Sequence, residues 1–584
     1  MKRVTPAGNG SAPRLGLLLL CMAACDGGDP PPVEPTANVA EAAPWFEEVA
    51  AESGLDFVHD SGHRDRYFIP EIVSAGAALF DMDNDGDLDI YLVQSGEIQA
   101  AAAKRPPNRL FRNRGDGSFD DVTEASGAGD RGYGMGVATG DFDNDGRIDL
   151  YVTNLGANAL LRNAGNGRFT DVTAEAGVAG GTWSSSAAFL DYDGDGWLDL
   201  FVVNYIHWSP DVEIECYVAA GRSRLDYCGP VSYRAPARDT LYRNLGDGTF
   251  RDVSKPAGLA STLGNGLGVV TGDFDGDFRQ DIFVANDGLP NQLWLNQGNG
   301  TLSDHALLRG VAVAENGKVK AGMGVASEDI DDDGDLDILV VNMKGENDTL
   351  FVNEGAFFVD GTARFGLTKT TSSFTRFGLG FVDFDNDGRL DIYEANGRIR
   401  WHSQLWADDI YAEPNIVMRG TADGRFTELE PRGGTRELLV ATSRAAAFGD
   451  IDGDGRVDVL VANRDGPVHL LHNVAPAGHW LELRVFDTHG RDALGARVTL
   501  RVGGRRLRRD VRTASSYCAA NDPRVHIGLG AETDVTDIEV RWPDGRHEAF
   551  SPAETLDREV TLRQGEGTAP ARNSPSLDSP RRRP

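Results

Sequence analysis

The sequence predicts an all-β fold, a seven-bladed β-propeller followed by a small C-terminal β domain, and three observations support this prediction. A nine-residue loop with Asp at positions 1, 3, 5 and 9 recurs seven times along the 584 residues. The segments around these loops repeat one order of short strands and Gly-rich turns, in a chain that holds 71 glycines. A strand pattern that the last repeat lacks is found at the start of the chain.

The Asp loops indicate a metal. In each loop four carboxylates would repel one another unless a divalent cation lay among them. Ca²⁺ is the expected cofactor, with up to seven ions. An EF-hand is excluded because position 12 is Leu92, Val152 or Val202, inside apolar strand-like runs, and not the glutamate that an EF-hand needs.

The second repeat shows the strand order in full. A Gly-rich segment at 134–137 leads into the Asp loop and is followed by strand patterns at 150–154, 160–163 and 169–173. Four short strands per repeat, joined by Gly-rich turns, are typical of a propeller whose blades bury their faces against their neighbours.

The ring is predicted to close by strand exchange. The last repeat ends at 468–473 without the Phe-x-Asp-Val strand that ends the others, whereas Phe46-Glu47-Glu48-Val49 matches that strand. A strand at 45–50 that completes the last blade would remove the exposed sheet edges of an open ring. The propeller is therefore assigned to residues 45–475.

The Gly-rich strand and Asp loop resemble the FG-GAP/VCBS repeat of integrin-α-type propellers, over about residues 45–473. In that family the loop joins the first two strands of a blade and binds Ca²⁺. The resemblance implies ligation by the side chains at positions 1, 3, 5 and 9 and by the backbone carbonyl at position 7. The metal residues predicted in this way are Asp81, Asp83, Asp85, Asp87, Asp89, Asp141, Asp143, Asp145, Arg147, Asp149, Asp191, Asp193, Asp195, Trp197, Asp199, Asp273, Asp275, Asp277, Arg279, Asp281, Asp329, Asp331, Asp333, Asp335, Asp337, Asp383, Asp385, Asp387, Arg389, Asp391, Asp450, Asp452, Asp454, Arg456 and Asp458. In the fourth loop Phe278 replaces the turn glycine, so weaker binding is expected there.

Residues 477–563 are similar to the ASPIC/UnbV domain, on the motifs at 491–498 and 522–530. That domain follows such propellers in the cartilage-acidic-protein-like family. The basic run at 505–509 is predicted to be the solvated side of a hairpin, with docking on the acidic propeller or on anionic lipid as alternatives. Residues 565–584 are rich in Ser, Pro and Arg and are predicted to be disordered.

The N-terminus predicts export. Residues 1–24 resemble a bacterial lipoprotein signal peptide whose lipobox makes Cys25 the acylated first residue, before a Pro-rich linker at 25–44. The protein would then be lipid-anchored in the cell envelope, on the periplasmic or the surface side, and secretion after ordinary cleavage is the alternative. A membrane-spanning anchor is excluded because the apolar run at 15–20 is much shorter than the roughly 20 residues required.

Cysteine content agrees with an exported protein, and the charge limits the class of partner. Cys216 and Cys228 are the expected disulfide in an oxidising compartment, and Cys518 is expected to be a buried thiol. A net charge of −33 argues against a nucleic-acid partner.

Two long connections, about 205–239 and 394–415, would lie on the face opposite the Asp loops and carry clustered aromatic residues. Such residues suit stacking on a sugar or anchoring a protein, or they pack on one another to order the loops. The ligand-binding candidates are Tyr205, His207, Trp208, Trp401, His402 and Trp406. No catalytic motif is found, so an adhesion or interaction module for a protein or glycan is favoured. An envelope enzyme of the polysaccharide lyase or hydrolase type, with its site in the propeller funnel, is the alternative.

Overall fold

The computed structural model describes residues 43–218, 224–551 and 556–570. The predicted signal peptide, Cys25, nearly all of the predicted linker and residues 571–584 of the predicted disordered tail lie outside these residues. Within the described residues, no helix combines the length and the apolar character that crossing a bilayer requires.

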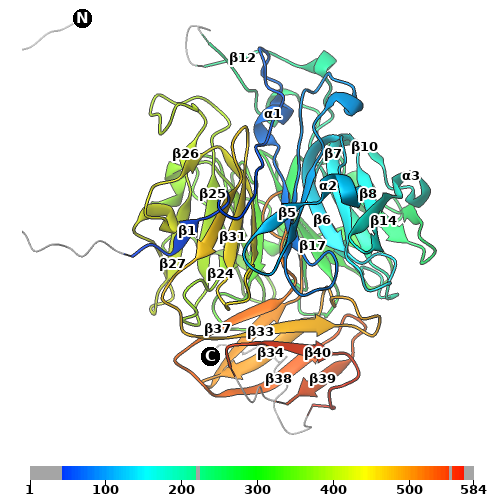
Figure 1. Ribbon diagram of the computed structural model, residues 1–584, viewed down its shortest axis with the longest axis vertical. Coiled ribbons are helices and arrows are strands. Elements are labelled where there is room, and N and C mark those ends of the chain that lie inside the picture. Colours follow the sequence, from blue (N-terminus) through cyan, green and yellow to red (C-terminus); the bar gives the residue numbers. More distant parts are fainter. Residues whose placement is uncertain (1–42, 219–223, 552–555, 571–584) are drawn as a thin grey trace, which may run out of the picture. The chain divides into compact units, whose positions relative to one another are not determined.

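The all-β propeller prediction is confirmed (Figure 1). The strand pairing among the described residues agrees with seven blades of four antiparallel strands. Blade 1 holds β2 (Ala77–Phe80), β3 (Asp89–Leu92), β4 (Arg109–Asn113) and β5 (Phe119–Asp121), and blade 2 holds β6 (Tyr133–Gly140), β7 (Asp149–Ala157), β8 (Ala159–Gly165) and β9 (Arg168–Asp171). Blade 3 holds β10 (Gly180–Leu190), β11 (Asp199–Asn204), β14 (Thr240–Asn244) and β15 (Phe250–Asp252), and blade 4 holds β16 (Gly266–Gly272), β17 (Asp281–Asn286), β18 (Gln292–Asn296) and β19 (Leu302–Asp304). Blade 5 holds β20 (Val325–Glu328), β21 (Asp337–Val340), β22 (Thr349–Asn353) and β23 (Phe358–Asp360), and blade 6 holds β24 (Arg376–Val382), β25 (Asp391–Asn396), β27 (Ile416–Gly420) and β28 (Phe426–Glu428).

Blade 7 closes the ring with the N-terminal strand. Its sheet holds β30 (Ser443–Gly449), β31 (Asp458–Asn463), β32 (His469–Asn473) and β1 (Phe46–Glu48). β1 pairs antiparallel with β32, so that Phe46 lies opposite Asn473. The edge that would otherwise be open on β32 is thereby covered.

Alternation along each second strand sends its side chains to the two neighbouring blades. In β17, Phe283 packs with Ile338 of blade 5, whereas Ile282 and Val284 pack with Phe201 of blade 3. These three side chains of β17 are fully buried. This is why the second strands are apolar on both faces and why each blade depends on its neighbours.

Short elements lie in the connections between and within the blades. The α-helices are α1 (Ile69–Val73), α2 (Thr123–Ser126), α3 (Thr173–Ala176) and α4 (Ala306–Arg309), and the two-residue strands are β12 (Cys216–Tyr217), β13 (Leu225–Asp226), β26 (Glu413–Pro414) and β29 (Val440–Ala441). Single 3₁₀ turns lie at Ala102–Lys104, Pro210–Val212, Pro230–Ser232, Leu259–Ser261, Thr371–Ser373 and Arg432–Gly434.

The C-terminal residues form two further sheets on a shared core that includes Leu481, Ile538 and Trp542. One sheet holds β33 (His479–Phe486), β37 (Val525–Gly530) and β40 (Glu559–Arg563), and the other holds β34 (Arg497–Val502), β35 (Arg505–Asp510), β38 (Val535–Arg541) and β39 (His547–Phe550). Figure 1 shows these sheets, in orange and red, at one end of the propeller, while α1 and β12 lie at the other end.

Candidate metal loops and the two ends of the propeller

The loop between β6 and β7 illustrates how the carboxylates are held. Asp141 accepts hydrogen bonds from the backbone N–H groups of Asp145 (3.1 Å) and Gly146 (2.7 Å). Asp149 is fully buried at the start of β7 and accepts from the N–H of Asn163 (2.7 Å) on the next strand. The first carboxylate thus shapes the turn, and the last one ties the loop to the blade.

The carboxylate at loop position 3 is held differently. The Oδ1 atom of Asp143 is buried and has no hydrogen-bond partner among the described residues. The same atom is buried without a partner in four further loops, at Asp83, Asp193, Asp275 and Asp385. Carboxylate oxygens of Asp141, Asp143 and Asp149 lie within 4.8 Å of one another. Because a buried anionic oxygen without a donor is costly, this geometry fits a divalent cation with oxygen ligands.

The electrostatics agree with that fit. Burial, together with the charges of Asp145 and Asp141, raises the pKa of the Asp143 carboxyl to about 6. Burial raises the pKa of Asp89 and of Asp199 to about 8 in their own loops. A cation at the centre of each loop would offset both causes, since it replaces lost solvation and neutralises like charges.

A basic residue from the third strand flanks several loops, and the sequence reasoning missed it. Arg112, Arg243 and Arg419 form ion pairs with the position-3 carboxylates of loops 1, 3 and 6, at 2.8, 2.6 and 2.6 Å. In loop 7 the equivalent residue is His472, whose pKa is raised to about 9 by its hydrogen bond to Asp458. The available signal was a basic penultimate residue in the third strand of these repeats.

The fourth loop keeps its shape although it lacks the turn glycine. Phe278 adopts φ +68°, which is unfavourable for a residue with a side chain. Its N–H still donates to Asp273 (3.0 Å), and the guanidinium of Arg541 lies 3.9 Å from its ring centroid. The cation–π contact stabilises the strained residue. Weaker metal binding at this loop stays a prediction.

The C-terminal domain contacts the loop end of the propeller, and this corrects the interpretation of the basic run as a solvated face. Arg506 and Arg508 are buried. Arg505 forms hydrogen bonds with the Asp332 carboxylate (2.8 Å) and with the Gly388 carbonyl (2.9 Å). The physical reason is complementarity, because loops rich in carboxylates and outward carbonyls are acceptors for guanidinium donors.

A segment of the C-terminal domain also fills the axial channel. β36 (Ala519–Ala520) pairs in parallel with β2, the innermost strand of blade 1. Ser516 donates to the Ala446 carbonyl of blade 7 (2.8 Å), and Tyr517 donates to the Val73 carbonyl in α1 (2.6 Å). Tyr517 and Cys518 are buried, so Cys518 is a buried free thiol as predicted. The funnel that an enzyme would use is occupied here by the chain itself.

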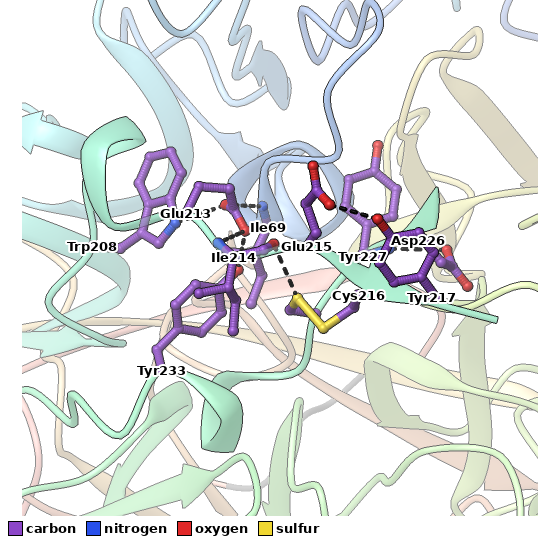
Figure 2. Close-up of a disulfide and its surroundings, with 11 residues drawn as sticks. Ile69, Trp208, Glu213, Ile214, Glu215, Cys216, Tyr217, Asp226, Tyr227 and Tyr233 are labelled. Atoms are coloured by element: carbon purple, nitrogen blue, oxygen red, sulfur yellow. Dashed lines mark hydrogen bonds between the residues drawn. A yellow bond between two sulfur atoms is a disulfide. The ribbon is translucent and has the colours of Figure 1, made fainter. Parts of the chain in front are cut away.

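At the opposite end, a disulfide joins Cys216 and Cys228, with 5.3 Å between their Cα atoms, as the sequence predicts. Figure 2 shows Glu213 close to this disulfide, facing Trp208 and Tyr233. The Glu213 carboxylate accepts from the Trp208 indole N–H (2.9 Å) and from the Tyr233 hydroxyl (2.5 Å). The polar edge of Trp208 is therefore used to order the loop.

The six ligand-binding candidates divide into two groups. Tyr205 is buried and donates to Asp287 (2.7 Å). The half-buried rings of Trp208 and Trp406 pack on other aromatic rings, at 5.5 Å from Phe68 and 6.1 Å from Phe374 respectively. The candidates that stay accessible are Trp401, which is half-buried, and His207 and His402, which are exposed. The structure brings the first group into the packing and leaves the second at the surface.

A polar cluster beside α1 was also missed from the sequence. Nδ1 of His63 lies 2.8 Å from the Glu71 carboxylate and 3.1 Å from the Tyr227 hydroxyl, to which Arg464 donates (3.1 Å). Glu71 is buried, and burial raises its pKa. No spacing in the sequence connects these residues, because the fold assembles them from the N-terminal segment, blade 3 and blade 7.

Repeated Asp loops on a closed ring of blades, with a β domain docked on the loop end, define a propeller of FG-GAP-like repeats that is followed by an ASPIC and UnbV domain. The FG-GAP-like repeat family matches residues 81–152, 141–202, 229–284, 273–340 and 329–394, and the ASPIC and UnbV family matches residues 487–569.

The chain is related to cartilage acidic protein 1, as the predicted resemblance implied. It is 28% identical to the Mus musculus protein over 544 residues, which cover 88% of this chain and 75% of the relative. It is 29% identical to the Homo sapiens protein over 308 residues, which cover 51% of this chain and 43% of the relative. Among solved structures, the BP39L lectin from Burkholderia pseudomallei aligns with a TM-score of 0.36 at 14% identity, over 69% of this chain and 97% of the lectin.

Proposed function

We propose that this protein is an exported, calcium-stabilised propeller that binds a partner at the bacterial cell envelope. The observation that carries the calcium assignment is the buried, unpartnered Oδ1 atom at position 3 of five loops. The carboxylates at positions 1, 3, 5 and 9 and the carbonyl at position 7 would hold the ion in an all-oxygen set that suits Ca²⁺. When bound, Ca²⁺ supplies positive charge and a cross-link between the first two strands of a blade.

The partner site is assigned to the end opposite the Asp loops. Exposed aliphatic side chains lie on the two long connections there, with Val231 at 58%, Val212 at 52% and Leu405 at 50% exposure. Because Tyr205 and Trp208 are used in packing, few aromatic faces are left for stacking on a sugar. Exposed apolar groups on these connections suit a protein surface, so a protein partner is favoured over a glycan.

Replacing Val231 and Leu405 together with Asp should weaken binding to the protein partner at least about tenfold, because a buried charge opposes an apolar interface. The purified calcium-loaded chain would be titrated against solubilised envelope proteins and against a glycan array. Leu307→Asp is the matched control, since Leu307 is 77% exposed on α4, away from both long connections. Equal binding by the double variant and the control would contradict the assigned end, and selective glycan binding would move the partner class to glycans.

The envelope location is supported by the lipobox-like N-terminus. Cys25→Ser is expected to move the exported chain from the detergent phase to the aqueous phase in a detergent partition assay, because the acyl chains hold it in the membrane. Cys21→Ser, inside the signal peptide, is the control that should stay in the detergent phase. A wild-type chain found in the aqueous phase would instead support secretion.

The alternative, an envelope enzyme with its site in the funnel, has less support, because Tyr517 and α1 fill that part of the channel. His63 with Glu71 and Tyr227 is the place where such an activity would be sought, since a carboxylate there orients an imidazole that is 27% exposed.

A further inference from the structure

Neighbouring Asp loops are joined at three junctions by an asparagine at loop position 4. Its side-chain amide donates to the backbone carbonyl at position 6 of the next loop. The pairs are Asn84 to Gly146 (2.8 Å), Asn144 to Gly196 (3.1 Å) and Asn386 to Gly455 (2.8 Å). These bonds form part of a ring of contacts at the loop end of the propeller.

The other four junctions lack a side-chain donor at position 4, where the residues are Gly194, Gly276, Asp332 and Gly453. At three of them an arginine of the C-terminal domain donates to the same carbonyl. The pairs are Arg508 to Gly334 (2.9 Å), Arg505 to Gly388 (2.9 Å) and Arg524 to Gly86 (2.5 Å). At the fourth junction Arg497 donates to Asp273 of the next loop (2.6 Å). These arginines stand where asparagine is missing, and at the Asn144 junction Arg491 donates to the Gly196 carbonyl (3.1 Å) in addition to the asparagine.

The carbonyl at position 6 belongs to the peptide group that leads into position 7, a predicted calcium ligand. In loop 6 the N–H of Gly388 donates to Asp383 (2.8 Å), and the N–H of Arg389 donates to Asp387 (3.0 Å). Arg505 donates to the Gly388 carbonyl and so fixes the peptide group between Gly388 and Arg389. Outer hydrogen bonds of this kind orient metal ligands and change metal affinity by about 10- to 100-fold.

We propose that Arg505, Arg508 and Arg524 are positioning residues for the calcium sites of loops 6, 5 and 1. The C-terminal domain thereby completes metal sites that the propeller sequence leaves short of one donor. This inference rests on the calcium sites of the proposed function. The partner of the loop end is accordingly the chain's own C-terminal domain.

Charge and geometry predict opposite effects on calcium affinity when such an arginine is removed. Loss of a positive charge beside an acidic loop would by Coulomb's law alone tighten calcium binding. Loss of the donor to the position-6 carbonyl would loosen the turn and weaken calcium binding. Weaker binding by an arginine variant therefore identifies positioning through the carbonyl.

Arg505→Ala tests the proposal first, because the Arg505 side chain is 49% exposed and its loss leaves no cavity in the core. The full mature chain would be examined by native mass spectrometry at buffered free calcium, which counts the bound ions. We expect one ion fewer than in the wild type at calcium levels that just saturate the wild type, with an affinity for that ion at least about tenfold weaker. Arg546→Ala is the control, since that side chain is 59% exposed and pairs with Asp544 in the C-terminal domain.

Asp332→Asn provides a rescue. Asp332 has φ +58°, close to the values of Asn84 (+60°) and Asn144 (+57°), so an asparagine there can take the same backbone conformation. The double variant Arg505→Ala with Asp332→Asn should regain the lost ion, because the new amide can donate to the Gly388 carbonyl. A merely structural role for Arg505 would not be restored by a residue of another loop.

The outcomes separate this inference from the proposed function. One ion lost in Arg505→Ala and regained in the double variant supports it. A full set of ions in Arg505→Ala, or a loss that Asp332→Asn does not restore, overturns it and leaves the calcium sites standing. A wild-type chain that binds no calcium overturns the proposed calcium sites, and the inference with them.

Discussion

Removal of calcium should lower the melting temperature of the mature chain by about 10 °C or more, the largest change expected from a single treatment. Extracellular-type sites have dissociation constants on the order of 10⁻⁴ to 10⁻³ M. At free calcium tenfold above such a constant, one site contributes about 1.4 kcal/mol to the free energy of unfolding. Seven loops together would then contribute about 10 kcal/mol, comparable to the whole stability of an ordinary domain.

The measurement is a thermal melt in calcium and in chelator, on a chain whose bound calcium is counted by elemental analysis. The effect of Asp143→Asn on the melting temperature should change sign between the two conditions. In calcium the substitution removes a ligand charge and should lower the melting temperature, whereas in chelator it relieves repulsion and should raise it. The matched control is Asp116→Asn, in an exposed turn outside the loops, which should be neutral in both. A melt that stays the same after verified removal of calcium would show that the loops are turns without a structural metal.

Repetition explains why so much of the propeller could be predicted from the sequence. Each Asp loop is local, and its carboxylates bond to N–H groups four and five residues away, as Asp141 does with Asp145 and Gly146. The closing strand could also be predicted, although Phe46 and Asn473 are far apart in the sequence, because the last repeat lacks a strand that the first residues supply. In a periodic sequence, a repeat that lacks one strand can be recognised by comparison with the other repeats.

The C-terminal domain has no repeat to compare with, and its contacts could not be predicted. The basic run was taken for a solvated face because a charged strand is usually exposed, yet Arg508 is buried. Nothing near Tyr517 in the sequence indicates that it reaches α1 through the axial channel. The aromatic candidates were ambiguous for a related reason, since Trp208 has the same side chain whether it binds a ligand or, as here, donates to Glu213.

Phe46→Ala is expected to have the largest effect of any single substitution in the propeller. Phe46 is 1% exposed, and its ring centroid lies 5.1 Å from that of Phe384 and 6.3 Å from that of Tyr393. Truncation of a buried phenylalanine costs about 3–5 kcal/mol. Here the loss falls on β1, a strand of three residues that closes the ring, so its pairing with β32 should fail as well.

Two measurements distinguish ring opening from simple loss of packing. Denaturant unfolding in calcium should show the loss of stability, and light scattering after size-exclusion chromatography should show self-association, because an uncovered β32 offers a free sheet edge. Phe357→Ala is the control: the same substitution at a side chain that is 51% exposed should leave both readouts unchanged. If Phe46→Ala lowered stability but the chain stayed monomeric at high concentration, β1 would still cover the edge, and closure would depend on the backbone pairing with Asn473 and His472 and not on the aromatic anchor.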